Sequence, residues 1–401
     1  MGGRPGPGRP DRRRRPRPAR PGARVVVFPY DFRRSVADAA ARLAADVHDR
    51  LVHLGSGPNE PRVVVVAHSM GGLVARHWAG PGGGHRACRA IVTLGTPHRG
   101  SPKALDVAAN GFTLGPLRVA SRLSKLLRSW PGFHELLPRY PMVEAAGRAR
   151  PPGHRYPKDL TVGWLDPALT TPAWRVHQDI AGAWDGFGAG EAPGVVPVYG
   201  CGLDTLEAAR LGPDDSLSVS TRRPAGIGND EWRGDRTVPS FSAIPLELDS
   251  VAGKGLHRPV PGLAHGNLTA WDGLGAELRY LCTGVTGHAR GPGHRSIVAD
   301  AEEQWPTGRP CPVTVRVYER IDPGRSGLVE ADNVHRVEVD DGRGWRPATR
   351  AADGWAFTLE PGPAGVATVR VRATTVDGDD PNGATLRVRR IDPDVLEETG
   401  W

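Results

Sequence analysis

The apolar positions between residues 24 and 96 alternate between short hydrophobic runs and helical spacing. Residues 62–67, RVVVVA, contain four β-branched residues in succession, a pattern typical of a strand buried on both faces. The repeat of apolar residues from Val36 to Leu54 instead predicts a helix, with Ser35 and Asp38 as a capping box at its start and Gly55 after its end. The order strand, helix, strand, helix, strand predicts a parallel sheet with right-handed crossovers. The remaining elements are expected as strands at 24–28 and 89–95 and a helix at 71–79.

This periodicity weakens between residues 101 and 190 and returns as a strand at 194–202. Proline and glycine interrupt short helical pieces in the first segment, which we interpret as an insertion over the edge of the sheet. Its tryptophans could line an acyl-chain pocket, although filling a core is the more common role of such side chains. A polar loop, a segment at 234–248 and a helix ending near residue 281 complete the predicted domain. The tryptophans of the insertion are Trp130, Trp164, Trp174 and Trp184.

After Gly284 the pattern changes to alternation of apolar and polar residues with a period of two. Turns rich in glycine, proline and aspartate separate the runs, which predicts an antiparallel β-sandwich with one face in contact with water. The Cys, Trp, Cys spacing of antibody domains is missing, so we expect an immunoglobulin-like or fibronectin-like module. The chain is therefore divided into an α/β domain at 24–285 and a β domain at 286–401. The expected strands are 313–318, 334–339, 355–359, 366–374 and 385–390.

Charge changes this picture only at the N-terminus. The formal net charge is +8, but residues 1–24 hold nine arginines and one aspartate, which leaves 43 basic and 43 acidic residues in the rest. Residues 1–23 are dominated by arginine, proline and glycine without an apolar period, so we expect a disordered head. Because the body is neutral and carries no known nucleic-acid-binding motif, we do not expect nucleic acid as a partner.

Targeting signals and cysteines bear on the location of the protein and on metal binding. The sequence contains no apolar run of 18 residues and no signal peptide, so we expect a cytoplasmic protein, unless a start further upstream directs secretion. The cysteines are far apart and form no CxxC or Cys/His cluster, which argues against a metal site. We expect free thiols, no metal and no cofactor. The cysteines are Cys88, Cys201, Cys282 and Cys311.

Ser69 lies on the predicted turn between the strand at 62–67 and the following helix. A serine hydroxyl reacts at neutral pH only if it is exposed, aligned and deprotonated by a neighbour, and a sharp strand-to-helix turn supplies the first two conditions. The turn needs small neighbours, which Ala67 and Gly71 provide in a GxSxG pattern with alanine in the first position. We therefore predict Ser69 as a nucleophile, with the backbone N–H of Met70 stabilising an oxyanion at the helix N-terminus.

A general base and an orienting acid are expected further along the chain, in the order Ser, Asp, His. We favour Asp235 in GDRTVP and His265 in LAHGNL, because a helix is expected to follow this histidine directly. Asp204 is the competing acid and His257 the competing base. Two other histidines close to strand ends are expected to be positioning or packing residues: His68 and His98.

Seven segments in order give the chain a resemblance to a known family. They are FPYDFRRS (28–35), VVAHSMGGLVARHW (65–78), TLGTPHRGSPKAL (93–105), ELLPRYP (135–141), VYGCGLDT (198–205), GDRTVP (234–239) and AHGNL (264–268). Over residues 25–285 the chain resembles the lecithin:cholesterol acyltransferase family of α/β-hydrolases, in particular its bacterial lipase-like or acyltransferase-like members. The resemblance implies a triad of Ser69, Asp235 and His265 that acts on acyl groups of lipids or other esters, and it allows contact with a membrane surface.

One part of the family pattern is not found. In the family, a strand precedes the PYDWR-like segment, and its turn supplies the second oxyanion N–H. Residues upstream of 24 contain no strand pattern, so we expect an α/β-hydrolase sheet that is truncated at its N-terminal side, with an unknown second donor. Loss of one oxyanion donor costs on the order of 10² to 10³ in rate. The alternative function is therefore a catalytically impaired hydrolase-like scaffold whose β-sandwich is a binding module.

Overall fold

The computed structural model divides the chain into two compact units, residues 1–31 and 32–401. It describes residues 25–55, 63–114, 117–119, 121–145, 154–188, 190–222, 233–248, 257–271, 273–283, 296–302, 304–320, 328–331, 333–375 and 383–393. The head predicted at 1–23 lies outside the described residues.

The strand expected at 24–28 is absent from the described part of the first unit. Residues 25–31 form neither helix nor strand, and the exposed fractions of Val25 and Val27 are 63% and 72%. A run of valines favours extended backbone, but a strand also needs a partner for its N–H and C=O groups. Within the first unit, the residues that the structure describes offer no such partner, so the prediction of a buried strand is wrong.

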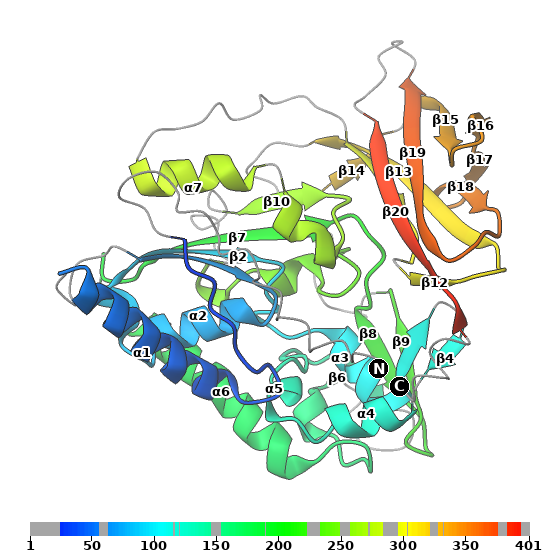
Figure 1. Ribbon diagram of the computed structural model, residues 1–401. Helices are drawn as coiled ribbons and strands as arrows, with labels where there is room; N and C mark the ends of the chain where they lie inside the picture. The colour runs from blue at the N-terminus through cyan, green and yellow to red at the C-terminus, as the bar shows by residue number, and fades with distance from the viewer. Residues whose placement is uncertain are drawn as a thin grey trace, which may run out of the picture. The chain divides into compact units, whose positions relative to one another are not determined.

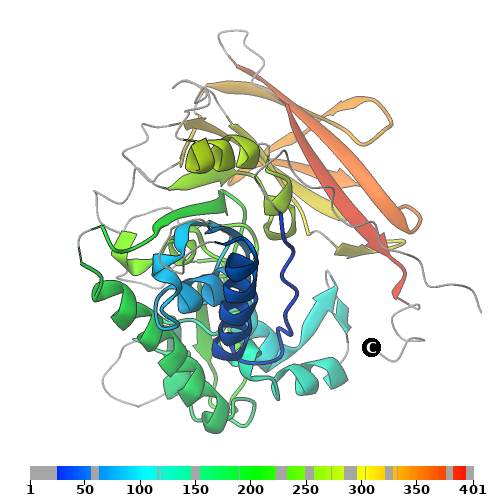
Figure 2. The ribbon, with the colours of Figure 1, turned by 60° about the vertical axis from the view of Figure 1, so that its left-hand side comes forward.

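The second unit contains a parallel sheet in the order β1-β2-β7-β10. Helices α1 and α2 lie on one side of this sheet and α7 on the other (Figure 1), and Figure 2 shows α1 nearly end-on beside α2. This arrangement confirms the predicted α/β-hydrolase-like fold class. The strands are β1 (Val63–His68), β2 (Cys88–Leu94), β7 (Gly194–Cys201) and β10 (Arg258–Pro261), and the helices are α1 (Val36–His53), α2 (Gly71–Ala79) and α7 (Leu274–Thr283).

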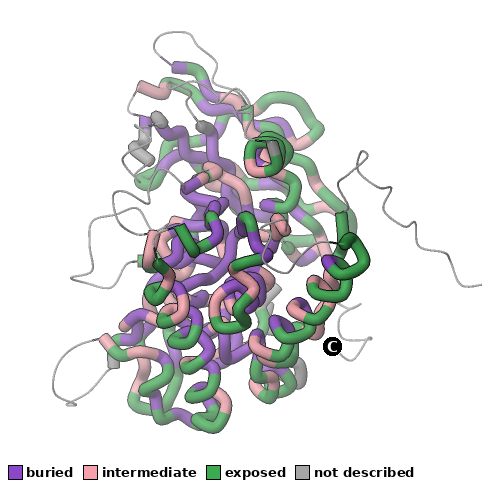
Figure 3. The backbone as a smooth tube through the Cα atoms, turned by 90° about the vertical axis from the view of Figure 1, so that its left-hand side faces the viewer, coloured by how far each residue is buried: buried purple, intermediate pink, exposed green. Residues whose placement is uncertain are grey.

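The prediction that residues 63–66 are buried on both faces is wrong. Val66 is 42% exposed, and its three predecessors are only partly buried. Among the described residues β1 pairs with β2 alone, so it is an edge strand of the described sheet. The inner strands β2 and β7 are covered on both faces, and Ile91 and Val92 of β2 are fully buried. Figure 3 shows the buried backbone gathered in the interior, away from the outer helices.

The segment between residues 101 and 190 forms helices and short strands, and its interpretation as an insertion over the edge of the sheet stays a prediction. Its strands β5 and β6 join β8 and β9 in a second small sheet, so the region after β7 that we expected as a polar loop contains a hairpin. The strands of this hairpin, β8 and β9, have four residues each, which is too short for a clear period of two. The elements are α3 (Pro102–Asn110), β3 (Phe112–Leu114), β4 (Leu117–Val119), α4 (Ser121–Leu127), α5 (Pro131–His134), β5 (Val143–Ala145), β6 (His154–Arg155), α6 (Pro167–Asp185), β8 (Ala208–Leu211) and β9 (Leu217–Ser220), with 3₁₀ helices at Gly84–Arg86, Pro157–Asp159, Ser240–Ala243, Leu246–Leu248 and His265–Ala270.

The tryptophans of this segment pack within the protein. Trp184 is 7% exposed, and its ring stacks on the guanidinium of Arg76 at 4.6 Å while its Nε1–H donates to the Arg76 carbonyl. Trp174 stacks on Arg139 and lines a small cavity with His177, at which neither Ser69 nor His265 is found. Trp184 therefore fills the protein core and does not support the alternative of an acyl-chain pocket at this residue.

The C-terminal region forms two five-stranded sheets, mostly antiparallel, that share one hydrophobic core. Each of the five predicted strands falls within an observed one, and the additional strands are three to five residues long. One sheet contains β11 (Ser296–Asp300), β13 (Cys311–Arg320), β14 (Leu328–Glu330), β17 (Thr349–Ala351) and β18 (Gly354–Leu359), and the other contains β12 (Gln304–Pro306), β15 (Val334–Asp340), β16 (Trp345–Pro347), β19 (Gly365–Thr375) and β20 (Ala384–Ile391). The immunoglobulin-like assignment stays a prediction.

The expectation that one face of these strands is in water is wrong for part of β13. Val313, Val315 and Val317 point into the shared core as expected. On the opposite face, Arg316 and Tyr318 are only 1% and 2% exposed. They are covered by the loops that follow β7, which a period of two in the sequence cannot reveal.

None of the helices that the structure describes has the length and apolar character needed to cross a membrane.

All four cysteines are free thiols. Burial raises the pKa of Cys88 to about 12, so this thiol stays protonated at neutral pH.

A buried carboxyl group joins α1 to the insertion. The Glu135 carboxylate accepts hydrogen bonds from the Ser35 hydroxyl and the Val36 N–H, both at 2.7 Å, at the N-terminus of α1. Ser35 Oγ in turn accepts from Ala37 N–H, so the predicted capping serine does cap the helix, while Asp38 pairs with Arg34. Glu135 is the distant partner that a local capping-box pattern cannot predict.

Glu135 should make stability depend on pH. Burial raises its pKa from 4.5 to about 7, so the folded protein keeps a proton that the unfolded chain has lost in this interval. The contribution to stability is therefore complete below pH 4.5 and is lost as pH rises to about 7, by up to about 3 kcal/mol. We expect Glu135→Gln to flatten this slope in urea unfolding measured across the interval. The exposed Glu144→Gln is the matched control and should keep the slope, and a slope unchanged in Glu135→Gln would contradict the assignment.

Candidate active site

Ser69 lies on a strained turn directly after β1. Its φ of +53° is in the left-handed region, which non-glycine residues rarely adopt. Two hydrogen bonds hold it there: its N–H donates to the Leu94 carbonyl at 2.8 Å, and its carbonyl accepts from the Thr96 hydroxyl at 2.8 Å. The turn therefore presents the Ser69 side chain at the carboxyl end of the sheet, as the sequence predicted.

Close packing at this turn also occurs at Gly72, which follows the two small residues predicted from the motif. A Cβ at Gly72 would lie 2.0 Å from Thr96 Oγ1, the same atom that binds the Ser69 carbonyl. Ala67, in the first position of the motif, is buried and fits without difficulty. The second glycine is thus required because α2 crosses close to the end of β2.

His265 is brought next to Ser69 from the other end of the α/β domain. It follows β10, and its Nε2 lies 2.9 Å from Ser69 Oγ. On the other side of the ring, Nδ1 lies 2.8 Å from Asp235 Oδ2. When Nδ1–H donates a hydrogen bond to Asp235, the Nε2 atom is free to accept the Ser69 hydroxyl proton. The structure therefore brings the three residues predicted from the sequence into one hydrogen-bonded row.

Asp235 is held by its own loop. Its side chain is 1% exposed, and Oδ1 accepts from the backbone N–H groups of Thr237 and Val238 at 3.0 and 2.7 Å. Its carbonyl accepts from His265 N–H at 3.0 Å. These bonds leave Oδ2 directed at the imidazole, so the orientation of the acid depends on the conformation of the loop.

Two glycines leave room for this pair of side chains. A Cβ at Gly95, where φ is +59°, would lie 2.9 Å from Asp235 Oδ2 and 3.0 Å from His265 Nδ1. A Cβ at Gly200 in β7 would lie 2.7 Å from Asp235 Cβ. The neighbouring strands thus approach the acid and base too closely for any larger residue.

His68 contacts both the backbone and the ring of His265. Its Nε2 lies 2.9 Å from the His265 carbonyl, and the two rings are 4.8 Å apart. Burial lowers the pKa of His68, which keeps its ring neutral at pH 7 with the Nε2–H donating to that carbonyl. His98 instead is a packing residue, since it lies buried between Arg76 and Thr93.

The competing acid and base lie elsewhere. Asp204 pairs with Arg316 of β13, and His257 directs its Nε2 to the Leu248 carbonyl at 3.0 Å. His257 also packs edge-on against Tyr199. None of these contacts involves Ser69 or His265.

Met70 is the N-cap of α2 and is 6% exposed. Within the described ranges, its backbone N–H makes no hydrogen bond, and it follows the Ser69 carbonyl at the positive end of the helix dipole. This is the position that an oxyanion donor needs. A second donor is not identified among the residues that the structure describes.

Comparison with protein families and curated proteins gives one partial match. A family model described as "PGAP1-like alpha/beta domain" matches residues 41–115, a minority of the chain that includes Ser69. The search of curated proteins gives no match. The resemblance to the lecithin:cholesterol acyltransferase family therefore stays a prediction.

Three solved structures illustrate the range of structural similarity. The Tle4–Tli4 complex shares 17% identity over 60% of this chain and 64% of that chain, with a TM-score of 0.44. The mature lipase BlEst2 of Bacillus licheniformis shares 12% identity over 62% of this chain and 75% of that chain, with a TM-score of 0.33. The phospholipase PlaB of Legionella pneumophila shares 12% identity over 88% of this chain and 77% of that chain, with a TM-score of 0.23. The chain thus spans less than two thirds of the matched Tle4–Tli4 chain.

Proposed function

We propose that the protein is a serine-dependent enzyme that cleaves ester bonds through an acyl-enzyme. The observation that carries this proposal is the continuous row Ser69 Oγ, His265 Nε2, His265 Nδ1 and Asp235 Oδ2, with contacts of 2.9 and 2.8 Å. A serine, a base within hydrogen-bond reach and an acid that orients the base are the parts that nucleophilic acyl transfer requires.

The proposed reaction begins with attack of Ser69 Oγ on the carbonyl carbon of the ester. His265 Nε2 takes the hydroxyl proton, and Asp235 stabilises the imidazolium that forms. The Met70 N–H donates to the negatively charged oxygen of the tetrahedral intermediate. Collapse of the intermediate breaks the bond to the alcohol oxygen, which receives the proton from His265.

Either water or an alcohol then attacks the acyl-enzyme. Attack by water gives a lipase or esterase, and attack by a second alcohol gives an O-acyltransferase. We propose lipid or other acyl esters as substrates and treat the two acceptors as outcomes of one assay. The ratio of free acid to transferred ester, measured with increasing glycerol, distinguishes them.

Covalent labelling tests the proposal directly. We expect a fluorophosphonate probe to modify the native protein, with mass spectrometry placing the adduct on the peptide that contains Ser69. Heat-denatured protein is the control, because an unfolded serine is not activated. If native protein is not labelled, the enzyme proposal fails and the alternative of a non-catalytic scaffold with a binding module is favoured.

A further inference from the structure

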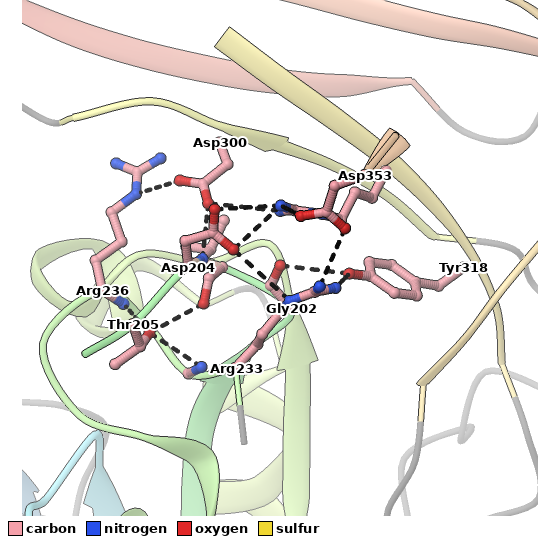
Figure 4. Close-up of polar contacts among 11 residues, drawn as sticks. Gly202, Asp204, Thr205, Arg233, Arg236, Asp300, Tyr318 and Asp353 are labelled. Atoms are coloured by element: carbon pink, nitrogen blue, oxygen red, sulfur yellow. Dashed lines mark hydrogen bonds and ion pairs between the residues drawn. The ribbon is translucent and has the colours of Figure 1, made fainter. Parts of the chain in front are cut away.

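A cluster of charged residues joins the loop that contains Asp235 to the C-terminal sheets (Figure 4). Three residues come from the loops of the α/β domain and three from the C-terminal region. We call this group the ionic clamp. Its members are Asp204, Arg233 and Arg236 on the first side and Asp300, Arg316 and Asp353 on the second.

Arg236 connects the clamp to the acid because it directly follows Asp235. Its φ is +76°, a left-handed conformation that persists in a non-glycine residue only where surrounding contacts hold it. One such contact is internal to the α/β domain: the Arg236 N–H donates to Thr205 Oγ1 at 3.0 Å. The other comes from β11, where Asp300 Oδ1 accepts from Arg236 Nε at 2.7 Å.

Asp300 ties together two loops with its two oxygens. While Oδ1 binds Arg236, Oδ2 accepts from the Asp204 N–H at 2.7 Å. The side chains of Asp300 and Arg236 are 9% and 11% exposed, so their pairing is largely shielded from solvent. Removal of one partner would leave the other charge buried without compensation.

Arg316 completes the clamp from β13. Its side chain is 1% exposed and reaches Asp353 Oδ2 at 2.7 Å and Asp204 Oδ1 at 3.1 Å. Asp353 also accepts from Arg233 Nη2 at 3.1 Å, so two arginines from different domains share this carboxylate. A buried guanidinium needs such partners, which fixes the position of the loops that supply them.

A second contact, between apolar side chains, lies next to the base His265. Val298 of β11 and Tyr318 of β13 pack with Leu203 and Ala264 in a small buried cluster. Ala264 immediately precedes His265, and Leu203 pairs with Gly234, which immediately precedes Asp235. The C-terminal sheet therefore packs against the residue before the base and against the backbone partner of the residue before the acid.

From these contacts we infer that Asp300 and Arg316 of the C-terminal region are positioning residues, which hold the Asp235 loop in the conformation that directs Oδ2 at His265. The inference rests on the proposed function for its catalytic consequence. Because Asp235 is oriented by the backbone N–H groups of Thr237 and Val238, a shift of the loop moves the acid itself. Displacement of a reacting group by about 1 Å costs on the order of 10²-fold in rate.

The test compares Asp300→Asn with Asp341→Asn. Asp341 is the control, since its carboxylate is as buried as that of Asp300 and pairs at 2.7 Å with Arg346, a residue outside the ionic clamp. We expect Asp300→Asn to lower kcat for an ester about tenfold to a hundredfold with little change in KM. Asp341→Asn should leave both values unchanged, even if it lowers the melting temperature as much as Asp300→Asn does.

The pH profile separates positioning from a loss of folded protein. If the Asp235 carboxylate moves away from His265, its negative charge stabilises the protonated imidazole less. The imidazole then stays neutral down to a lower pH, so the low-pH limb of kcat/KM should move to lower pH in Asp300→Asn. A smaller folded fraction would lower the whole profile without moving the limb. Arg236→Gln is the second variant, and it should shift the limb in the same direction even if Asp300→Asn does not fold.

Hydrogen–deuterium exchange tests the positioning of the loop independently of enzyme activity. We expect faster exchange in peptides covering residues 233–248 in Asp300→Asn and wild-type exchange there in Asp341→Asn. If this loop exchanges as in the wild type, the inference is overturned, whether or not the protein is an enzyme. If the loop exchanges faster but the wild type is not labelled by a fluorophosphonate, the clamp stands and the proposed function fails.

Discussion

Replacing Ser69 by alanine is expected to reduce kcat for ester cleavage by about 10⁶-fold, to the level that substrate binding and the oxyanion donor alone support. The reason is geometric: His265 Nε2 would face a methyl group in place of the hydroxyl at 2.9 Å, and no other nucleophile occupies that point. The measurement is steady-state hydrolysis of a short acyl ester together with loss of fluorophosphonate labelling.

The control for this variant is Ser216→Ala. Ser216 is an exposed serine in the turn before β9, where its hydroxyl donates to Asp214, and its loss should leave kcat unchanged. Thermal unfolding of both variants should resemble that of the wild type, because alanine keeps the small side chain that the turn requires. Ester hydrolysis by Ser69→Ala at the wild-type rate would exclude Ser69 as the nucleophile.

Replacing His265 by alanine is expected to have an effect of similar size, again about 10⁶-fold in kcat. Without the imidazole, the Ser69 hydroxyl has no base within hydrogen-bond distance, and Asp235 has nothing to orient. The double variant Ser69→Ala with His265→Ala should be no slower than either single variant, since the two residues act as a unit.

His257→Ala is the matched control for the base. Sequence reasoning alone left His257 as a competitor, but its Nε2 lies 3.0 Å from the Leu248 carbonyl and its ring packs on Tyr199. We expect a loss of stability with unchanged kcat. A collapse of kcat in this variant, with His265→Ala still active, would reverse the assignment of the base.

Local sequence determined the nucleophile turn and most of the strands. The run of valines, the small residue Ala67 and the following helix all specify a strand-to-helix turn within a dozen residues, and this turn is observed at Ser69. The five longest C-terminal strands were predictable for the same reason, because their period of two extends over five or more residues. The short strands β8 and β9 lack a sufficient period and were missed.

Burial was less predictable than secondary structure. The valines of β1 predicted a strand covered on both faces, but Val66 is 42% exposed because β1 lies at the edge of the described sheet. Conversely, Arg316 occupies a position where the pattern predicts solvent and is buried. In both cases the outcome depends on which element lies alongside, and a pattern within one strand does not specify its neighbour.

The choice between Asp235 and Asp204 shows the same division for the candidate site. The sequence by itself determined that two acids follow β7 and that a serine lies on a strained turn, because both depend on neighbours in the chain. Only the tertiary structure decided which acid meets His265: Asp235 does so at 2.8 Å, while Asp204 pairs with Arg316 from more than a hundred residues away. The physical reason is that carboxylates of equal chemistry are distinguished by the charges packed against them, and those charges come together only when the chain folds.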